Sequence, residues 1–217
     1  MEKNSAMHAL DVELIENGED FQAAREYARQ LADERGLHMI PAFHRDLLSG
    51  VASYCIEFLR AVPDLDVVYA PIGQGSGICS MIAARNALGH SAEIVGVVSS
   101  HAPAYALSFA TGKTIESSVT TQLVDGLACR LPDDDALSII CLGANRIVQV
   151  SDTDVASAMK LLFVSTHNVV EGVGAAPLAA AFAEREQLRG RKVGLVASGG
   201  NVDRDVFATV LGNVNDR

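Results

Sequence analysis

Four strand-length apolar runs, separated by segments with a helical period, constrain the fold of this chain more than any other feature. Each run is short and mainly apolar, and Val67–Ile72 is continuously apolar, which is typical of a strand buried on both faces of a parallel sheet. The helical segments between them supply the crossover connections that parallel pairing requires. The sequence therefore predicts an α/β fold with a parallel sheet. The expected strands are Val67–Ile72, Glu93–Val98, Arg146–Val150 and Val193–Ala197.

The expected helices begin and end at residues that suit helix termini. Asp20 can cap a helix over Phe21–Glu34, and Gly36 can end it. Either Ser151 or Asp152 can cap the helix Val155–Phe163. The other expected helices are Leu47–Leu59, Ile78–Leu88, Pro103–Thr111, Ala136–Gly143, Glu171–Glu186 and Asp203–Leu211.

Two parts of the chain are less regular. In the more polar first part, Val12–Glu16 is predicted as a short strand and His38–Phe43 as extended chain, with a link between two lobes near Ala42–Asp46. The stretch Lys113–Asp135 shows no clear period, and we interpret it as a surface excursion.

Composition excludes several classes of function. The 217 residues are 49% hydrophobic and 20% charged, unlike a disordered protein. A formal net charge of -10, without a basic block, argues against a nucleic-acid partner. No apolar run has the length of a membrane-spanning helix, and the first residues lack the apolar core of a signal peptide. We therefore expect a cytoplasmic protein with no membrane partner.

The four cysteines carry no spacing typical of a metal site or a redox motif. They lie within or beside apolar stretches, which favours small buried thiols over disulfide or zinc chemistry. We therefore expect no metal site. The cysteines are Cys55, Cys79, Cys129 and Cys141.

A glycine-rich loop follows the first of the four apolar strands and precedes a helix. Its residues are Gly73, Gln74, Gly75, Ser76 and Gly77. Glycines let backbone amides converge, and a helix start adds partial positive charge, so the loop suits a phosphate or a carboxylate. Ile78 stands where a dinucleotide fingerprint needs glycine, and no Lys-Ser/Thr pair completes a nucleotide P-loop. A single phosphate group fits better; the alternative is a tight turn that binds nothing.

Two further segments have the same small-residue character. Ser198, Gly199 and Gly200 follow the last apolar strand, where open α/β sheets bind ligands, although Ser198 can instead cap a helix that starts at Asn201. The other segment is His167–Pro177, in which Glu171 stands at a helix start, where a carboxylate is expected in any case.

Taken together and in order, these segments resemble the fold type II pyridoxal-phosphate enzymes, specifically the threonine/serine dehydratase (ammonia-lyase) group. VVYAPIGQGSG is similar to the strand and loop that hold the cofactor phosphate, and AEIVGVVS to the strand that follows. QLVDGLA is similar to TIADGLA, VVEGVGAAPLAA to EPAGAAALAA, and ASGGNVD to SGGNVD. The segment from Ser5 to Phe43 resembles the latter part of the family's small domain, so the resemblance covers essentially the whole chain.

The resemblance implies a fold, a cofactor and residue roles. It implies a three-layer tryptophan-synthase-β-like fold truncated at the N-terminus, with residues 1–43 from the small domain and residues 44–217 from the large domain. Gly73, Gln74, Gly75, Ser76 and Gly77 would cradle the phosphate of pyridoxal 5'-phosphate, and Ser198 would hydrogen-bond its pyridine nitrogen. Glu171, Gly199 and Gly200 would lie at the cofactor ring. The reaction would convert threonine or serine to a 2-oxo acid and ammonia.

The chain also departs from the family. The Ser-x-Lys-x-Arg-Gly segment, whose lysine forms the Schiff base, is absent, as is the Gly-Asn-His loop, and no lysine of the chain has those neighbours. Both would precede Met1 in a full-length relative. Val98 and Ser99 replace a frequent Glu-Pro, which puts the divalent-cation site of some relatives in doubt, and Val51 stands where glutamine is common.

The main hypothesis is therefore the C-terminal portion of a pyridoxal-phosphate-dependent dehydratase-like lyase that is inactive by itself, with no catalytic residue of its own assigned. The alternative is a non-catalytic module that binds pyridoxal phosphate or another phosphate ligand. The expected partners are a small amino-acid substrate, further copies of the chain, or a complementary N-terminal fragment.

Overall fold

The computed structural model describes residues 2–212 and divides them into two compact units. The smaller unit comprises residues 2–41 and 201–212, and the larger comprises residues 42–200. The assignment of residues 1–43 and 44–217 to two enzyme domains stays a prediction, and residues 213–217 lie outside the described residues.

The smaller unit contains three helices within its described residues: α1 (Glu2–His8), α2 (Phe21–Arg35) and α9 (Arg204–Gly212). As predicted, the Asp20 side chain caps α2 by accepting the Ala23 N–H at 2.8 Å. Gly36 ends α2 in the left-handed conformation, at φ 64°. The predicted strand Val12–Glu16 is wrong, because the unit offers no described strand with which it can pair. Residues 38–43 form no strand either.

The larger unit is built on a four-stranded parallel sheet in the order β3-β2-β1-β4. The strands are β1 (Val67–Pro71), β2 (Glu93–Ser99), β3 (Arg146–Val150) and β4 (Val193–Leu195). The predicted α/β fold with a parallel sheet is confirmed. The chain moves outward from β1 to β2 and β3, then returns to place β4 on the other side of β1. The sheet therefore has a topological switch point between β1 and β4, where open α/β sheets bind ligands.

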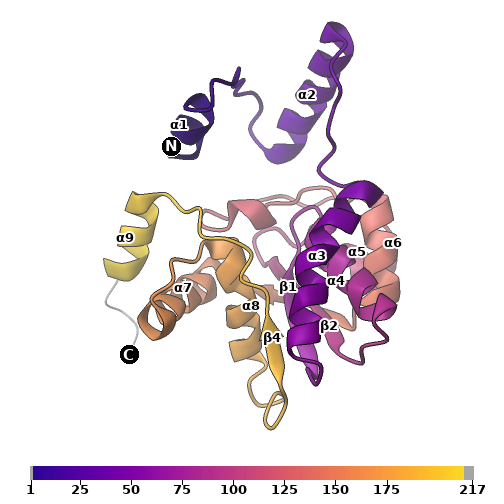
Figure 1. Ribbon diagram of the computed structural model, residues 1–217. Helices are drawn as coiled ribbons and strands as arrows, with labels where there is room; N and C mark the ends of the chain where they lie inside the picture. The colour runs from indigo at the N-terminus through magenta and orange to yellow at the C-terminus, as the bar shows by residue number, and fades with distance from the viewer. Residues whose placement is uncertain (1, 213–217) are drawn as a thin grey trace. The chain divides into compact units, whose positions relative to one another are not determined.

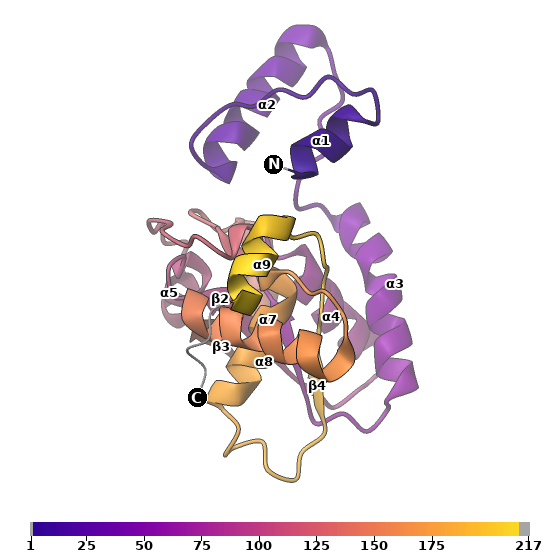
Figure 2. The same cartoon turned by 90° about the vertical axis from the view of Figure 1, so that its left-hand side faces the viewer.

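Helices cover both faces of this sheet (Figures 1 and 2). One layer contains α3 (Arg45–Ala61), α4 (Ser76–Ala87) and α6 (Asp134–Gly143), with α4 packed on both other helices. The opposite layer contains α7 (Asp152–Thr166) and α8 (Gly172–Ala183). The remaining helix, α5 (Ala104–Thr111), packs on α6 and β3.

Side chains alternate across β1, as the pleat of a strand requires. Val68 and Ala70 belong to the hydrophobic cluster with α3 and α4, and both are buried. Tyr69 points to the other face, where its hydroxyl donates a hydrogen bond to Glu184 just after α8. Both faces of β1 are therefore covered, which explains its uninterrupted apolar sequence.

An ion network joins the strands at the edge of the sheet where they begin. Arg146 on β3 pairs with Glu93 on β2 at 3.0 Å and with Glu184 at 2.7 Å. Arg191, before β4, pairs with Glu93 at 2.9 Å. Hydrogen bonds from Arg146 hold the pKa of Glu184 below its ordinary value, and those from Arg191 and Arg146 do the same for the pKa of Glu93. The network leaves the opposite edge of the sheet to the glycine-rich loops.

The cysteine prediction is right for three residues and wrong for one. Cys55, Cys79 and Cys129 are buried, whereas Cys141 is exposed because it lies on the outer side of α6.

Among residues 2–212, no group of three or more His, Cys, Asp or Glu side chains is arranged to hold a metal ion. In the same range, no helix combines the length and the apolar character needed to cross a membrane.

Candidate cofactor site

The predicted phosphate loop connects the end of β1 to the start of α4. Gly75 is the N-cap residue of α4 and has φ 98°, a conformation that residues with a Cβ rarely adopt. Within the described chain no side chain caps α4, so the first amides of the helix, beginning at Ser76 and Gly77, keep their hydrogen-bonding capacity. A helix start with free amides attracts anions.

The buried side chain of Tyr105 supports this loop through hydrogen bonds. Its hydroxyl donates to the carbonyl oxygen of Gln74 at 3.0 Å and accepts the Asp133 N–H at 3.2 Å. Tyr105 is 1% exposed, and burial raises the pKa of its phenol far above the ordinary value. The hydroxyl therefore stays protonated and remains a donor to the loop.

The segment around the short 3-10 helix η1 (Asp125–Leu127) presses against the same loop. A Cβ on Gly73 would overlap the carbonyl oxygen of Gly126, so only glycine fits there. The interpretation of Lys113–Asp135 as a surface excursion is therefore wrong for its second half, where Val124 and Leu127 are fully buried. This part of the chain shows no helical or strand period because its backbone is irregular, yet its apolar side chains belong to the core.

Ser198 follows β4 at the neighbouring strand end. The Val196 N–H donates to the Tyr69 carbonyl at 3.1 Å, which extends the contact between these strands one residue beyond β4. Because α9 begins at Arg204, the alternative in which Ser198 caps a helix starting at Asn201 is wrong. Ser198 is exposed and its hydroxyl is available at the switch point.

Glu171 connects the start of α8 to the segment Ser198–Gly200 that follows β4. It is the N-cap residue of α8, and its backbone N–H donates to the Gly199 carbonyl at 3.0 Å. A Cβ on Gly199 would come within 2.5 Å of the Glu171 Oε1, and one on Gly200 within 2.5 Å of the Val169 carbonyl oxygen. The half-buried Glu171 carboxylate therefore folds over Gly199 rather than pointing into solvent.

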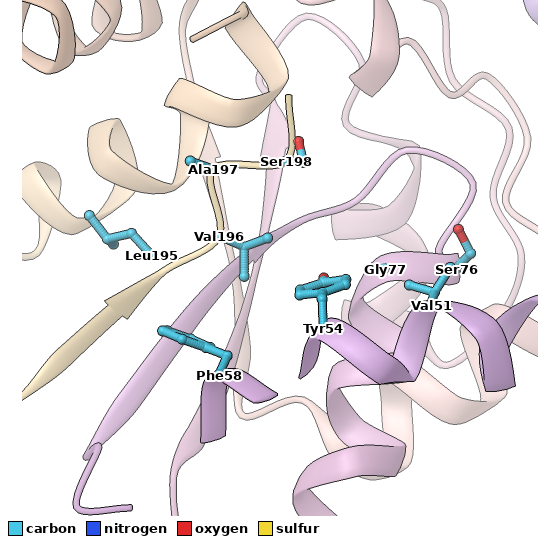
Figure 3. A pocket seen from close by; sticks show the side chains of 9 residues that line it. All are labelled: Val51, Tyr54, Phe58, Ser76, Gly77, Leu195, Val196, Ala197 and Ser198. Carbon is cyan, nitrogen blue, oxygen red and sulfur yellow. The ribbon is translucent and has the colours of Figure 1, made fainter. Parts of the chain in front are cut away.

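A cavity of about 490 Å³ lies between the phosphate loop and the end of β4. Ser76 and Gly77 line it at the start of α4, and Ser198 lines it at the end of β4. Figure 3 shows the rings of Tyr54 and Phe58, which project from α3 toward Val196 and Leu195 and form its apolar wall. The remaining lining residues are Val51 and Ala197.

The structure thus brings part of the predicted site into one cavity. Ser76, Gly77 and Ser198 line it, whereas Gly73, Gln74 and Gly75 form the loop behind it, and Glu171, Gly199 and Gly200 form the adjoining backbone layer. The apolar wall from α3 and the support from Tyr105 were missed. They carry no local signal, because a tyrosine or phenylalanine at helical spacing reads as ordinary core.

Among residues 2–212, no lysine lines this cavity. In the larger unit, Lys113 follows α5, Lys160 lies on α7, and Lys192 precedes β4 and pairs with Asp64. Lys192 is at the start of β4, whereas the cavity is at its end.

Comparison with known proteins identifies the class of protein to which this fold and site belong. The family described as "Pyridoxal-phosphate dependent enzyme" matches residues 1–199. The chain belongs to this family, in its fold type II branch with a tryptophan-synthase-β-like fold.

Within the family the chain is similar to ammonia-lyases. It is 31% identical over 211 residues to the L-threonine ammonia-lyase of Geobacter sulfurreducens, covering 97% of this chain and 52% of that protein. It is 30% identical to the L-threo-3-hydroxyaspartate ammonia-lyase of Saccharomyces cerevisiae, covering 87% of this chain and 58% of that protein. The processed form of threonine deaminase isoform 2 from Solanum lycopersicum superposes with a TM-score of 0.88 at 25% identity, covering 98% of this chain and 63% of the solved one.

The chain therefore spans about half the length of the curated relatives that it matches.

The residues of the site can be compared with what the family's cofactor, pyridoxal phosphate, needs for binding. The start of α4 has no side-chain cap within the described chain and lines the cavity, which suits an anionic phosphate, whereas the start of α8 carries the Glu171 carboxylate and lies outside the cavity lining. The buried Gln74 Oε1 has no partner among residues 2–212; as an acceptor it can bind a donor group of a ligand but not the oxygens of an ionised phosphate. Ser76 and Ser198 both line one cavity. These residues fit the phosphate and the ring of the cofactor.

Proposed function

We propose that this chain forms the phosphate- and ring-binding part of a pyridoxal-phosphate-dependent ammonia-lyase, which converts a hydroxy amino acid such as threonine or serine to a 2-oxo acid and ammonia. The observation that carries the proposal is the shared cavity, which is lined by Ser76 and Gly77 on one side and by Ser198 on the other. The relatives named as threonine and hydroxyaspartate ammonia-lyases support this substrate class.

In this proposal the chain's own residues bind and orient the cofactor. Backbone amides at the start of α4, with the Ser76 hydroxyl, hold its phosphate. Ser198 hydrogen-bonds the pyridine nitrogen, and as a neutral hydroxyl it does not force protonation there. When bound, the cofactor supplies an electron sink for the amino acid's α-carbon. Tyr54 and Phe58 shield one side of the cavity from water.

A lysine for the reaction is not among the cavity's lining residues. We propose that the 217-residue chain binds the cofactor but does not turn over threonine or serine at the family's rates. The lysine would come from a polypeptide segment outside these residues, in the same or another chain. Two features could bind such a segment. One is the apolar wall of the cavity, and the other is the outer edge of β4, which pairs only with β1 among the described strands.

The same observation favours a second candidate, a non-catalytic module that binds pyridoxal phosphate or another phosphate ligand. In that case the loop and Ser198 hold the ligand and no segment completes the site. Self-association of the chain is compatible with both candidates and is measured by light scattering after size exclusion.

The test is a fluorescence and absorbance titration of the purified chain with pyridoxal phosphate. Inorganic phosphate serves as competitor, and borohydride reduction with mass spectrometry follows. We expect saturable binding of pyridoxal phosphate that inorganic phosphate inhibits. After borohydride reduction, no one lysine should carry the cofactor specifically, and threonine and serine should yield no 2-oxo acid. Absence of binding would refute the proposal for both candidates. A specific adduct on one of the four lysines, with turnover, would refute the requirement for an outside segment.

Ser198→Ala separates the ring contact from the phosphate contact. This variant should keep the phosphate competition but weaken cofactor binding by about threefold to tenfold, since one hydrogen bond contributes roughly 0.5–1.5 kcal/mol. Ser53→Ala, an exposed serine on α3 outside the cavity lining, is the matched control and should bind like the unmodified chain.

A further inference from the structure

Asp152 has a role beyond the start of α7. The sequence allows Ser151 or Asp152 to cap this helix, and the structure assigns the cap to Ser151, which exchanges hydrogen bonds with Asp154 in a capping box. The Asp152 carboxylate instead turns to another segment. Its Oδ1 accepts the Thr121 hydroxyl at 2.7 Å, and its Oδ2 accepts the N–H of Gln122 at 2.8 Å and of Leu123 at 3.3 Å.

These three hydrogen bonds hold residues 121–123, which belong to no helix or strand of the described chain. Thr121 passes the constraint on, because its Oγ1 accepts the Val124 N–H at 3.2 Å. The Val124 carbonyl then accepts the Leu127 N–H at 3.0 Å, which closes η1. Since Val124 and Leu127 are both fully buried, the segment is fixed at one end by a charged group and at the other by packing.

The segment held by Asp152 lies against both parts of the cofactor site. On one side the Gly126 carbonyl abuts Gly73 of the phosphate loop. On the other side the Leu123 carbonyl oxygen would be 2.8 Å from a Cβ on Gly172, the first residue of α8, directly after Glu171. Val173 also packs over Gly126. A displacement of residues 121–127 would therefore move the phosphate loop and the start of α8 together.

We propose that Asp152 is a positioning residue for the phosphate loop: it holds residues 121–123, and through Gly126 and Leu123 sets the place of Gly73 and Gly172. The position of Asp152 explains how it reaches the site. It lies two residues after β3, at the same edge of the parallel sheet as the loops after β1 and β4. The N-terminus of α7 stabilises its negative charge. For cofactor binding, the inference rests on the proposed function.

The perturbation is Asp152→Asn, which keeps the shape of the side chain but brings an NH2 group against backbone donors. The matched control is Asp154→Asn, which removes the same charge from the same helical turn and breaks the capping box without touching residues 121–123. A merely structural loss at the start of α7 would appear in both variants.

The first readout needs no cofactor. Amide hydrogen exchange in peptides covering residues 72–80 and 121–127 should quicken by about tenfold in Asp152→Asn and stay unchanged in Asp154→Asn, as expected when a charge-assisted hydrogen-bond set is lost. If Asp152→Asn accelerates exchange only within residues 121–127 or only within α7, or if both variants behave alike, the positioning role is refuted.

The second readout is the ratio of the affinities for pyridoxal phosphate and for pyridoxal, which lacks the phosphate. Asp152→Asn should lower this ratio by about tenfold, because the phosphate loop is displaced while Ser198 is not; Asp154→Asn should leave it unchanged. If the unmodified chain binds neither compound, the proposed function fails, and hydrogen exchange alone decides the coupling between Asp152 and the loop. If the chain binds both and Asp152→Asn leaves the ratio unchanged, the inference fails and the proposed function survives.

Discussion

Tyr105→Phe tests the support of the phosphate loop most directly. The phenyl ring refills the space of the phenol, so the substitution creates almost no cavity and removes little besides the hydroxyl. Two groups then lose their partner: the Gln74 carbonyl, which accepts from the hydroxyl at 3.0 Å, and the Asp133 N–H, which donates to it at 3.2 Å. Because Tyr105 is only 1% exposed, water cannot replace the hydroxyl without rearrangement.

The size of the effect follows from these two contacts. Leaving a buried polar group unpaired costs about 1–3 kcal/mol, and partial relaxation at Asp133, the half-buried N-cap residue of α6, lowers the sum. We expect the free energy of unfolding of the larger unit to fall by about 2 kcal/mol. For a chain of this size such a loss lowers the melting temperature by about 4–8 °C.

The assay is urea unfolding followed by circular dichroism, together with a thermal scan. Tyr27→Phe on α2 is the control, because Tyr27 is half-buried and its hydroxyl makes no hydrogen bond within the described chain; the free energy of unfolding should change by less than about 0.5 kcal/mol. The reasoning is refuted if Tyr105→Phe is as stable as the control, since the Tyr105 hydroxyl would then contribute nothing measurable to the stability of the loop.

Three further predictions concern packing, pH and thiol reactivity. Gly200→Ala should destabilise the larger unit by about 2 kcal/mol or more, because its Cβ meets the Val169 backbone carbonyl, whereas Gly199→Ala should cost under about 1 kcal/mol, because its Cβ meets the movable end of Glu171; chemical denaturation compares them. The pKa of Glu184 is lowered from 4.5, chiefly by hydrogen bonds from Arg146, so its contribution to stability is present above pH 4.5 and is lost as the pH falls through the lower folded-state value. Glu184→Gln should therefore lower stability at neutral pH and flatten its decline below pH 4.5, and parallel acid curves for the two proteins would contradict this assignment. A thiol reagent should modify Cys141 alone in the native chain, since burial raises the pKa of Cys79 to about 12 and Cys55 and Cys129 are also buried; mass spectrometry of the modified peptides tests it.

The fold was predictable because hydrophobic period and helix termini act locally. Strand Arg146–Val150 was predicted at its observed bounds, and Asp20 and Gly36 were placed correctly at the ends of α2. Val12–Glu16 shows the limit of this reasoning, because a strand needs a partner that local sequence does not reveal. Cys141 shows it again, since apolar neighbours cannot tell the inner face of α6 from its outer face.

The site was predictable where glycine is required, and not where support comes from distant residues. Ser76, Gly77 and Ser198 fall at strand ends that the switch point brings together, so the spacing of apolar runs and glycines is enough to find them. Tyr105 bonds the backbone of the loop across 31 residues of sequence, and Asp152 bonds the Thr121 hydroxyl and two backbone N–H groups of residues 122–123 across 29–31 residues. A backbone carbonyl or N–H accepts any suitable partner, so neither end of such a bond leaves a motif in the sequence. Phosphate-binding loops are therefore easier to find in a sequence than the residues that keep them in shape, and those supporting residues are where substitutions should alter cofactor affinity without touching the cofactor.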